Sequence, residues 1–441
     1  MSTDPTALTA IELAEAYRRG ELRPRAVTEA YLKKAAPGPV YRELLEERAR
    51  AQADRAERQF ESGIDVGPLQ GIPLALKDLL DVEGTVTAAG SKVLAATTAA
   101  LADAPAVARL DAAGAVFLGK TVMTELAFSG VGINPHFGTP PNAFDPERIP
   151  GGSSSGSAVA VATGQACAAI GSDTGGSVRI PAAFNGLVGL KTSEGAIPGD
   201  GCVQLSFTLD VLGPIARTVR DAWLLYRALA ALPPAPIPPV PVRLRLAAPT
   251  TVVREELAPE VEDAFTAAVE RLEALGHEVV DIPAPLFNEI EETAGRYGTF
   301  AANEALALYE DLIERHGDEM DSRVTGRILA ARGRSSSDYI RLVLARRRWQ
   351  QEFWSQVAGF DAILAPTVPI VPPRLCELRD DNAYFETNRR CLRNTSLFNA
   401  VGGASIAVPA GVGPVGVMIS AAPGNEGLVC AVGELLTPSP N

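Results

Sequence analysis

The stretch PGGSSSGSAVAVATGQACAAIGSDTGGS, residues 150–177, holds two loops rich in glycine and serine, separated by a small-residue helix and a short apolar strand. A helix over about 153–165 would span roughly 20 Å at ~1.5 Å per residue. A strand of about six residues would return roughly 20 Å at ~3.3 Å per residue. Because the chain goes out and comes back by equal lengths, both serine loops are expected at one edge of a sheet, where α/β folds usually build their sites.

Outside this stretch, short apolar runs alternate with helix-like segments in both halves of the chain. The runs expected as buried strands are 72–81, 115–123, 165–173, 186–192, 243–249, 277–282, 360–367 and 403–411. Helices are expected over 8–60, 103–114, 156–164 and 258–276, and most of 287–358 is expected to be helical. This alternation predicts an α/β fold with a substantially parallel sheet.

A chain of 441 residues fits one large domain or two modest ones, and the organisation predicted here is a single domain. Its parts are an N-terminal helical segment (1–65), a core (70–220), a proline-rich connection (231–243) and a second half (244–441) with a helical region (287–358). The connection is expected to be extended, because proline cannot continue a helix or sit in a central strand.

Composition and charge describe an ordinary globular protein, with 46% hydrophobic residues and a net charge of −13. This acidic balance argues against a large phosphate-binding face, so no nucleic-acid partner is expected. The five cysteines form no CxxC pair, which indicates neither a disulfide framework nor a zinc site. Without a secretory signal or an uncharged apolar run of about 18 residues, a cytoplasmic protein with no membrane span is expected.

Residues 114–121, GAVFLGKT, satisfy the G-x-x-x-x-G-K-T pattern of a phosphate-binding loop. We reject this interpretation, because the middle residues of such a loop must curl, whereas Ala-Val-Phe-Leu favours a buried strand. In addition, a helix leads into Gly114, where a phosphate-binding loop follows a strand.

A serine in these loops needs a base before it can act as a nucleophile. Of the three histidines, His277 and His316 are expected at the surface, and a Ser-His-Asp triad would depend on His136. The alternative is Lys77, which lies in the apolar run GIPLALKDLLD (71–81). Burial lowers the pKa of a lysine from about 10.4, so a desolvated Lys77 could accept a proton directly or through a bridging hydroxyl.

Three motifs together resemble the amidase signature family. They are GIPLALKD (71–78), GGSSSGSA (151–158) and GSDTGGSVRIPAAFNGLVGLK (171–191), with weaker similarity at 209–219, 360–367 and 403–419. The resemblance implies a three-layer α/β/α sandwich around a large mixed, mostly parallel sheet. It implies no cofactor and no metal ion.

The resemblance also implies roles for individual residues. Ser177 matches the family nucleophile, Ser153 the bridging serine 24 positions earlier, and Lys77 the base. The bridging serine of relatives follows a cis peptide bond, so a cis Gly152–Ser153 bond is expected. The implied oxyanion hole consists of the backbone N–H groups of Thr174, Gly175, Gly176 and Ser177.

Five further residues are given supporting roles. Asp173 and Arg179 flank the nucleophile loop and are expected to brace it by hydrogen bonds, and Ser154 is expected to support the two catalytic serines. Met123 and Phe128 are expected in the wall of the substrate pocket. An ordinary structural interpretation also exists, in which Ser153 and Ser154 cap the following helix, the glycine loops are simple turns and Lys77 is a surface lysine next to Asp78.

Two functions fit these residues. The first is an amidohydrolase that cleaves a small carboxylic amide through an acyl-enzyme on Ser177. The second is the A subunit of a tRNA-dependent amidotransferase, in which Arg327 could hold the carboxylate of glutamine. Relatives commonly read K-P-T-x-G-R where this chain reads KTSEGA (191–196), and this departure, the acidic charge and the short chain favour the first function.

A third function, anion binding by the glycine loops without catalysis, is the least favoured. A serine-directed fluorophosphonate separates it from the first two, because only an activated Ser177 forms a covalent adduct. The sequence leaves the oligomeric state open, with a homodimer as one option.

Overall fold

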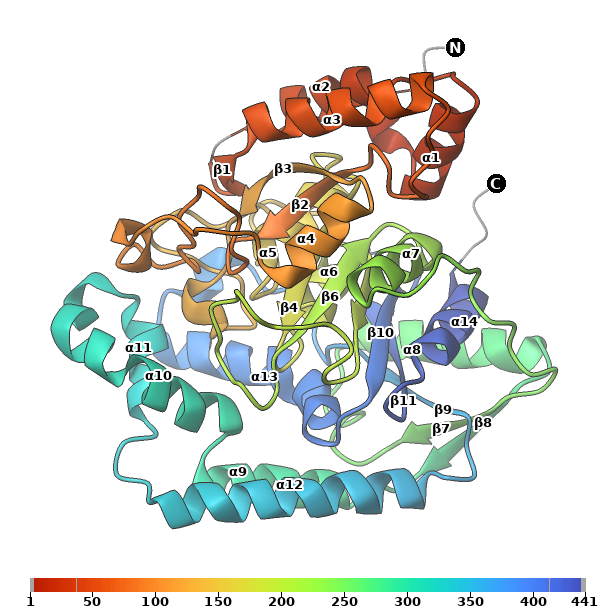
Figure 1. The fold of residues 1–441 in the computed structure, drawn as a ribbon. Helices are drawn as coiled ribbons and strands as arrows, with labels where there is room; N and C mark the ends of the chain where they lie inside the picture. Colours follow the sequence, from red (N-terminus) through yellow and green to blue (C-terminus); the bar gives the residue numbers. More distant parts are fainter. Residues whose placement is uncertain (1–3, 37, 412, 438–441) are drawn as a thin grey trace.

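A single sheet of eleven strands crosses the computed structural model, which describes residues 4–36, 38–411 and 413–437 (Figure 1). The strand order across the described residues is β1-β3-β2-β4-β6-β5-β10-β11-β9-β7-β8. The strands are β1 (Tyr41–Leu44), β2 (Pro73–Lys77), β3 (Val116–Thr121), β4 (Ala168–Asp173), β5 (Val188–Lys191), β6 (Val211–Ala216), β7 (Arg245–Pro249), β8 (Glu278–Ile282), β9 (Ala362–Pro366), β10 (Ala404–Pro409) and β11 (Gly416–Ala421). Both halves of the chain therefore contribute to one sheet.

The sheet is mixed, as predicted, but it is not mostly parallel. Among the described strands, four neighbouring pairs are parallel and six are antiparallel. The prediction was wrong because it counted the strands that helices connect and missed β1, β6 and β11. Each of these runs antiparallel to its neighbours, and β10 and β11 form a hairpin that needs no crossover helix.

Helices cover both faces of the sheet and form the expected three layers. The α-helices are α1 (Ala10–Arg18), α2 (Pro24–Lys34), α3 (Glu46–Glu61), α4 (Pro105–Ala112), α5 (Ser155–Ala162), α6 (Arg179–Phe184), α7 (Val219–Leu229), α8 (Pro259–Ala274), α9 (Leu286–Tyr297), α10 (Phe300–His316), α11 (Ser322–Leu329), α12 (Ser336–Gln356), α13 (Asp381–Ala400) and α14 (Glu426–Leu436). Short 3-10 helices occupy η1 (Pro5–Ala7), η2 (Leu94–Ala96), η3 (Glu125–Ala127), η4 (Gly317–Glu319) and η5 (Leu375–Leu378). Helices α7, α14 and α8 pack on the sheet in series, and α5 and α6 pack on it together with α13 behind α6.

Helices α9 and α12 run alongside each other (Figure 1), and α13 contacts both of them as well as α6. A cluster of aromatic side chains joins α9, α12 and α13. The ring of Phe353 on α12 lies 5.4 Å from that of Phe287 on α9 and 6.2 Å from that of Phe398 on α13. All three rings are buried, and such aromatic pairs contribute beyond the area they bury. The cluster fixes the helix whose other side faces the candidate site.

Most predicted elements are found, and the rejected phosphate-binding loop is indeed a strand. Val116–Thr121 forms the fully buried β3, and α4 leads into Gly114. The connection 231–243 contains neither helix nor strand and is held where Trp223 Nε1 donates to the Ala235 carbonyl at 2.8 Å. No helix in the described part of the chain combines the length and apolar character that crossing a bilayer requires.

Candidate active site

The two serine loops meet at one edge of the sheet, as the sequence predicts. Strand β2 lies between β3 and β4 and runs parallel to both, so the end of β2 is next to the end of β4. The Ser154 N–H donates to the Ser177 carbonyl at 3.2 Å, and Ser154 Oγ donates to the Ser172 carbonyl at 3.3 Å. These bonds join the loop before α5 directly to the loop after β4.

Lys77 is the last residue of β2, and its side chain is fully buried between the two loops. Its Nζ lies 2.7 Å from Ser153 Oγ and 2.8 Å from Ser172 Oγ. Burial lowers the pKa of Lys77 from 10.5 to about 7, although the nearby Asp210, Asp173 and Cys202 act in the opposite direction. A large fraction of this amine is therefore uncharged near neutral pH and can accept a proton.

Ser153 is held by the tightly packed loop that precedes α5. The Gly152–Ser153 peptide bond is cis, as the resemblance implies. A side chain at Gly152 would come within 2.8 Å of the Ser129 carbonyl oxygen, so only glycine fits there. The structure records no hydrogen bond between Ser153 Oγ and Ser177 Oγ, both of which lie in the described residues; catalytic hydrogen bonds often tighten only once substrate is bound.

The loop of Ser177 is tied down by a buried ion pair. Asp173 accepts from Arg179 Nε at 3.0 Å and Nη2 at 2.9 Å, and both side chains are fully buried. Asp173 also accepts from the N–H groups of Gly176 at 2.8 Å and Val178 at 3.2 Å. Burial alone would raise the pKa of Asp173, but the charge and hydrogen bonds of Arg179 hold it well below its usual range. The carboxylate therefore stays ionised and braces the loop.

One of the four N–H groups expected in the oxyanion hole, that of Gly176, already has a hydrogen-bond partner in the structure. The N–H of Gly176 points to Asp173 and is not available to a substrate. No hydrogen bond is recorded for the N–H groups of Thr174, Gly175 and Ser177 in the described chain, so these three remain as candidate donors. Gly176 has φ of 128°, and a side chain there would lie 2.1 Å from Thr395 Oγ1. Its role is to let the loop turn against α13.

A cavity of about 600 Å³ opens in front of Ser177. Its polar part near the catalytic loops is formed by Ser129, Thr174, Gly175 and Ser177. Its apolar part includes Phe128, Leu205, Leu209, Ile290, Phe300, Trp349 and Leu392, and the charged residues in its wall are Glu291, Arg327, Arg389 and Arg393. A largely apolar cavity with a few polar groups is typical of a small-molecule site.

The profile of the family described as Amidase matches residues 26–430. The chain belongs to the amidase signature family. It is 37% identical to the 2-amino-5-chloromuconic acid deaminase of Comamonas testosteroni over 388 residues, covering 86% of this chain and 84% of the relative. It is 35% identical to the A subunit of the glutamyl-tRNA(Gln) amidotransferase of Synechococcus sp. (strain WH7803), covering 81% of this chain and 82% of the relative. A crystal structure of an amidase superimposes with a TM-score of 0.87 at 35% identity, covering 97% of this chain and 99% of the other.

Arg327 and Phe128 form one wall of the cavity in this amidase. Arg327 Nη1 donates to the Phe128 carbonyl, and its guanidinium lies 3.9 Å from the centre of the Phe128 ring. Burial lowers the pKa of Arg327 to about 10, which still leaves it charged at neutral pH. Phe128 therefore lies where the sequence predicts it.

Met123, the other predicted wall residue, does not line the cavity. Its side chain is fully buried in the main core, and its carbonyl accepts from Asn134 Nδ2 at 2.7 Å. Met123 follows β3 closely, and side chains alternate between the two faces along an extended segment. The prediction was wrong because position in the sequence did not reveal which face this residue takes.

The histidines lie outside the serine–lysine cluster. His136 Nε2 is 3.1 Å from Glu125 Oε2, and His316 Nδ1 is 3.1 Å from Glu319 Oε1. His277 was expected at the surface, but it is buried and its Nδ1 accepts from the Leu244 N–H at 3.2 Å. In the part of the chain that the structure describes, no three His, Cys, Asp or Glu side chains are grouped as metal ligands would be.

Two residues of the site were missed by sequence reasoning. Ser172 lies 2.8 Å from Lys77 Nζ, and its signal was its place inside the motif GSDTGGS. Asp210 accepts from the Thr174 hydroxyl and from the N–H groups of Leu205 at 2.8 Å and Ser206 at 3.1 Å. Asp210 belongs to the weaker motif at 209–219, which gave the only signal for it.

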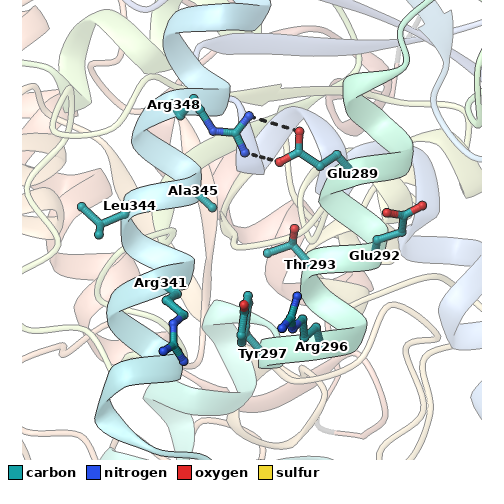
Figure 2. Close-up of a pocket in the computed structure, with 9 residues that line it drawn as sticks. All are labelled: Glu289, Glu292, Thr293, Arg296, Tyr297, Arg341, Leu344, Ala345 and Arg348. Atoms are coloured by element: carbon teal, nitrogen blue, oxygen red, sulfur yellow. Dashed lines mark hydrogen bonds and ion pairs between the residues drawn. The ribbon is translucent and has the colours of Figure 1, made fainter.

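A groove between α9 and α12 contains none of the predicted site residues (Figure 2). It measures about 560 Å³, and an Arg348–Glu289 ion pair crosses one end of it. The other charged residues of this groove are Glu292, Arg296 and Arg341. It offers no nucleophile next to a base, so the cavity at Ser177 is the candidate active site.

The segment KTSEGA (191–196) is anchored to the second half of the amidase. Glu194 pairs with Arg346 on α12, and the Ser193 N–H donates to Glu426 Oε1 at 2.8 Å. Lys191 Nζ donates to the Gly403 carbonyl at 2.8 Å. These contacts give the segment a structural role.

Proposed function

We propose that this amidase hydrolyses the C–N bond of a small carboxylic amide through an acyl-enzyme on Ser177. The observation that carries this proposal is the fully buried amine of Lys77, 2.7 Å from Ser153 Oγ, in a loop that is hydrogen-bonded to the loop of Ser177. A base with a pKa near the working pH is the form that proton transfer needs. The cavity in front of Ser177 supplies the space for the substrate.

In the proposed reaction, the neutral amine of Lys77 takes the proton of Ser153, and Ser153 takes the proton of Ser177. Ser177 Oγ attacks the carbonyl carbon, and the N–H groups of Thr174, Gly175 and Ser177 stabilise the negative oxygen. Ser153 then gives its proton to the leaving nitrogen and recovers one from Lys77. Water attacks the acyl-enzyme by the same relay and releases the carboxylic acid.

The residues that flank Ser177 have structural contacts of their own and take no part in the proposed proton relay. Asp173 and Arg179 neutralise each other behind the loop of Ser177. Ser154 uses its hydroxyl on the backbone of Ser172, so it positions β4 against α5. Both arrangements support the structural roles expected of these residues.

The largest effect of a single substitution is expected for Ser177→Ala. Removing the nucleophile of a serine hydrolase typically lowers kcat by about 10⁶-fold. Ammonia release from a panel of aliphatic, aromatic and amino-acid amides measures this loss and also identifies the acyl group. Turnover by Ser177→Ala at a rate close to that of the unchanged amidase would contradict the proposal.

The second candidate is a glutaminase component of a tRNA-dependent amidotransferase. It is favoured by the relative of that name and by Arg327, whose guanidinium lines the cavity and donates to a backbone carbonyl. Ammonia release by the purified chain alone supports a free-standing amidase. Inactivity that partner subunits relieve would support the second candidate.

Three further expectations stay predictions from the sequence. A single domain is supported by the sheet that takes strands from both halves. A homodimer is tested by sedimentation of the purified chain. A cytoplasmic location is tested by fractionation of the source cells.

A further inference from the structure

Lys77 has two hydroxyl partners, and the proposed relay uses only one of them. Ser172 Oγ lies 2.8 Å from Lys77 Nζ, almost as close as Ser153 Oγ at 2.7 Å. Ser172 belongs to β4 and is 5% exposed. Its position next to the base calls for a role of its own.

A neutral amine carries two N–H donors and one lone pair. Lys77 can take the proton of Ser153 only while its lone pair faces Ser153 Oγ. Its N–H groups must then find other acceptors, because a buried donor without a partner is unfavourable. Ser172 Oγ is an acceptor within hydrogen-bond range of Lys77 Nζ, and it can accept from the neutral amine and from the ammonium form.

The backbone holds Ser172 in a fixed place. Ser154 Oγ accepts from the Ser172 N–H at 3.4 Å and donates to the Ser172 carbonyl at 3.3 Å. Ser172 also pairs with Leu212 in the ladder between β4 and β6. The hydroxyl therefore stands on a rigid element, which is how functional groups are held in a productive geometry.

Ser172 also borders a second cavity, of about 260 Å³, which shares only Ala127 with the lining of the substrate cavity. Asp210, Cys202 and Leu79 line the same space. Asp210, Asp173 and Cys202 are the titratable groups that act on Lys77, and the neighbouring Asp78 is paired with Lys120 and Arg42. Ser172 thus stands between the buried amine and a space that water could fill.

We propose that Ser172 is a positioning residue, which holds one N–H of the neutral Lys77 so that the lone pair faces Ser153, and which keeps the amine apart from the second cavity. This inference rests on the proposed function, because it concerns the base of that reaction. Proton transfer is balanced as before: Ser153 loses its proton to Lys77 Nζ, and Ser172 neither gains nor loses one.

The test compares Ser172→Thr with Ser172→Val, which have the same shape and differ only in the hydroxyl. The rate of Ser177 labelling by a fluorophosphonate is measured against pH, because it reports the nucleophile without a physiological substrate. Ser172→Thr is expected to label within about threefold of the unchanged amidase. Ser172→Val is expected to label at least about tenfold more slowly. The acidic limb of its profile, the pH range in which the labelling rate falls as Lys77 takes up a proton, is expected at lower pH, because the ammonium has lost an acceptor. With any amide that is cleaved, kcat is expected to fall while KM stays the same.

Ser172→Ala tests the second half of the proposal and replaces the pair if either variant fails to fold. It leaves a space that water from the second cavity can enter, so its acidic limb is expected to move to higher pH. An unchanged rate and an unchanged limb in Ser172→Ala would overturn the proposal. Ser420→Ala is the matched control. Ser420 is buried and its Oγ lies 2.8 Å from Ser405 Oγ, so this variant also loses a buried hydroxyl–hydroxyl hydrogen bond, but one that does not contact Lys77.

Lys77→Met separates failure of this inference from failure of the proposed function. If Lys77→Met labels as fast as the unchanged amidase, the serine–lysine relay itself is wrong. If Lys77→Met labels slowly but Ser172→Val and Ser172→Thr both label normally, the relay stands and the role of Ser172 is overturned. Slow labelling by Ser172→Val alone supports the proposal.

Discussion

Two neighbouring strands of the amidase carry buried lysines with opposite surroundings. Lys77 closes β2, and Lys120 lies on β3, where it pairs with Leu76 in the parallel ladder. Both side chains are fully buried. Lys120 Nζ lies 3.0 Å from Asp78 Oδ1, whereas Lys77 has only the hydroxyls of Ser153 and Ser172 in hydrogen-bond range among the described residues.

The difference between the two lysines shows that burial alone does not make a base. Burial lowers the pKa of both amines, but at Lys120 the charge of Asp78 acts against it. Arg42 also pairs with Asp78, so the cluster around Lys120 is a closed network of opposite charges. A carboxylate partner favours the ammonium, whereas hydroxyl partners leave the amine free to change its charge. This contrast supports the proposed reactive role of Lys77 and a structural role for Lys120.

The largest expected difference between the two lysines is the effect of replacing each of them on turnover. Lys77→Met is expected to lower kcat by ~10²–10⁴-fold, the usual contribution of a general base. Lys120→Met, the matched control at the next strand, is expected to keep a rate close to that of the unchanged amidase. Ammonia release under identical conditions measures both. Equal losses in the two variants would break the comparison.

The two variants are expected to change stability in opposite directions. In the unfolded chain Lys77 binds a proton below about pH 10.5, whereas in the folded chain it binds one only below about pH 7. The free energy of unfolding therefore decreases as the pH falls from about 10.5 to about 7. At neutral pH, Lys77→Met is therefore expected to raise the free energy of unfolding by a few kcal/mol, at about 1.4 kcal/mol per pKa unit. This gain is expected to vanish towards pH 10.

Lys120→Met is expected to lower the free energy of unfolding, because it removes one partner of the buried Asp78. Breaking a buried ion pair costs about 3–5 kcal/mol, and the low end applies here because Arg42 remains. Urea denaturation of both variants at pH 7 measures these changes. A destabilised Lys77→Met together with an unaffected Lys120→Met would contradict the assignment.

Ser172→Asp gives Lys77 the kind of partner that Lys120 has. The new carboxylate is expected to raise the pKa of Lys77 by ~1–3 units and to move the acidic limb of kcat/KM upward by the same amount. Activity is then expected to be low at neutral pH and to recover at alkaline pH, where the amine loses its proton. An acidic limb that stays in place would show that Lys77 is not the titrating group.

The smallest expected effect concerns Asp210, the carboxylate with the strongest influence on Lys77. Asp210→Asn removes that charge and is expected to lower the pH of the acidic limb, because a nearby carboxylate favours the ammonium form of Lys77. Asp281→Asn, which removes an exposed carboxylate paired with Arg254, serves as the control and is expected to leave the limb unchanged. A limb that rises in Asp210→Asn contradicts the sign of this effect.

The sequence predicted the elements that apolar runs and motifs define, and it missed those that depend on tertiary contacts. The strands carrying Lys77 and Asp173 were found because both are short, buried and apolar. Strand β1 was missed because its sequence, YREL, lies in a charged, alanine-rich segment that favours helices. Strands β6 and β11 were recognised only as parts of motifs and not as strands. In addition, a short apolar run does not reveal in which direction a strand runs within the sheet.

The candidate site was predicted in the same uneven way. The motifs placed Lys77, Ser153 and Ser177 together, and a helix followed by a returning strand placed both serine loops at one edge of the sheet. The use of the Gly176 N–H by Asp173 could not be predicted, because it depends on a backbone angle of the folded loop. The burial of Met123 depends on which face of an extended segment meets the core.

The most direct test of the central claim is the pH dependence of Ser177 labelling by a fluorophosphonate, from about pH 5 to about pH 9. A single acidic limb is expected near the pKa of Lys77, about 7, and it is expected to be absent from the slow residual labelling of Lys77→Met. A limb in the range of an ordinary carboxylate, or the same limb in Lys77→Met, would show that another group activates Ser177.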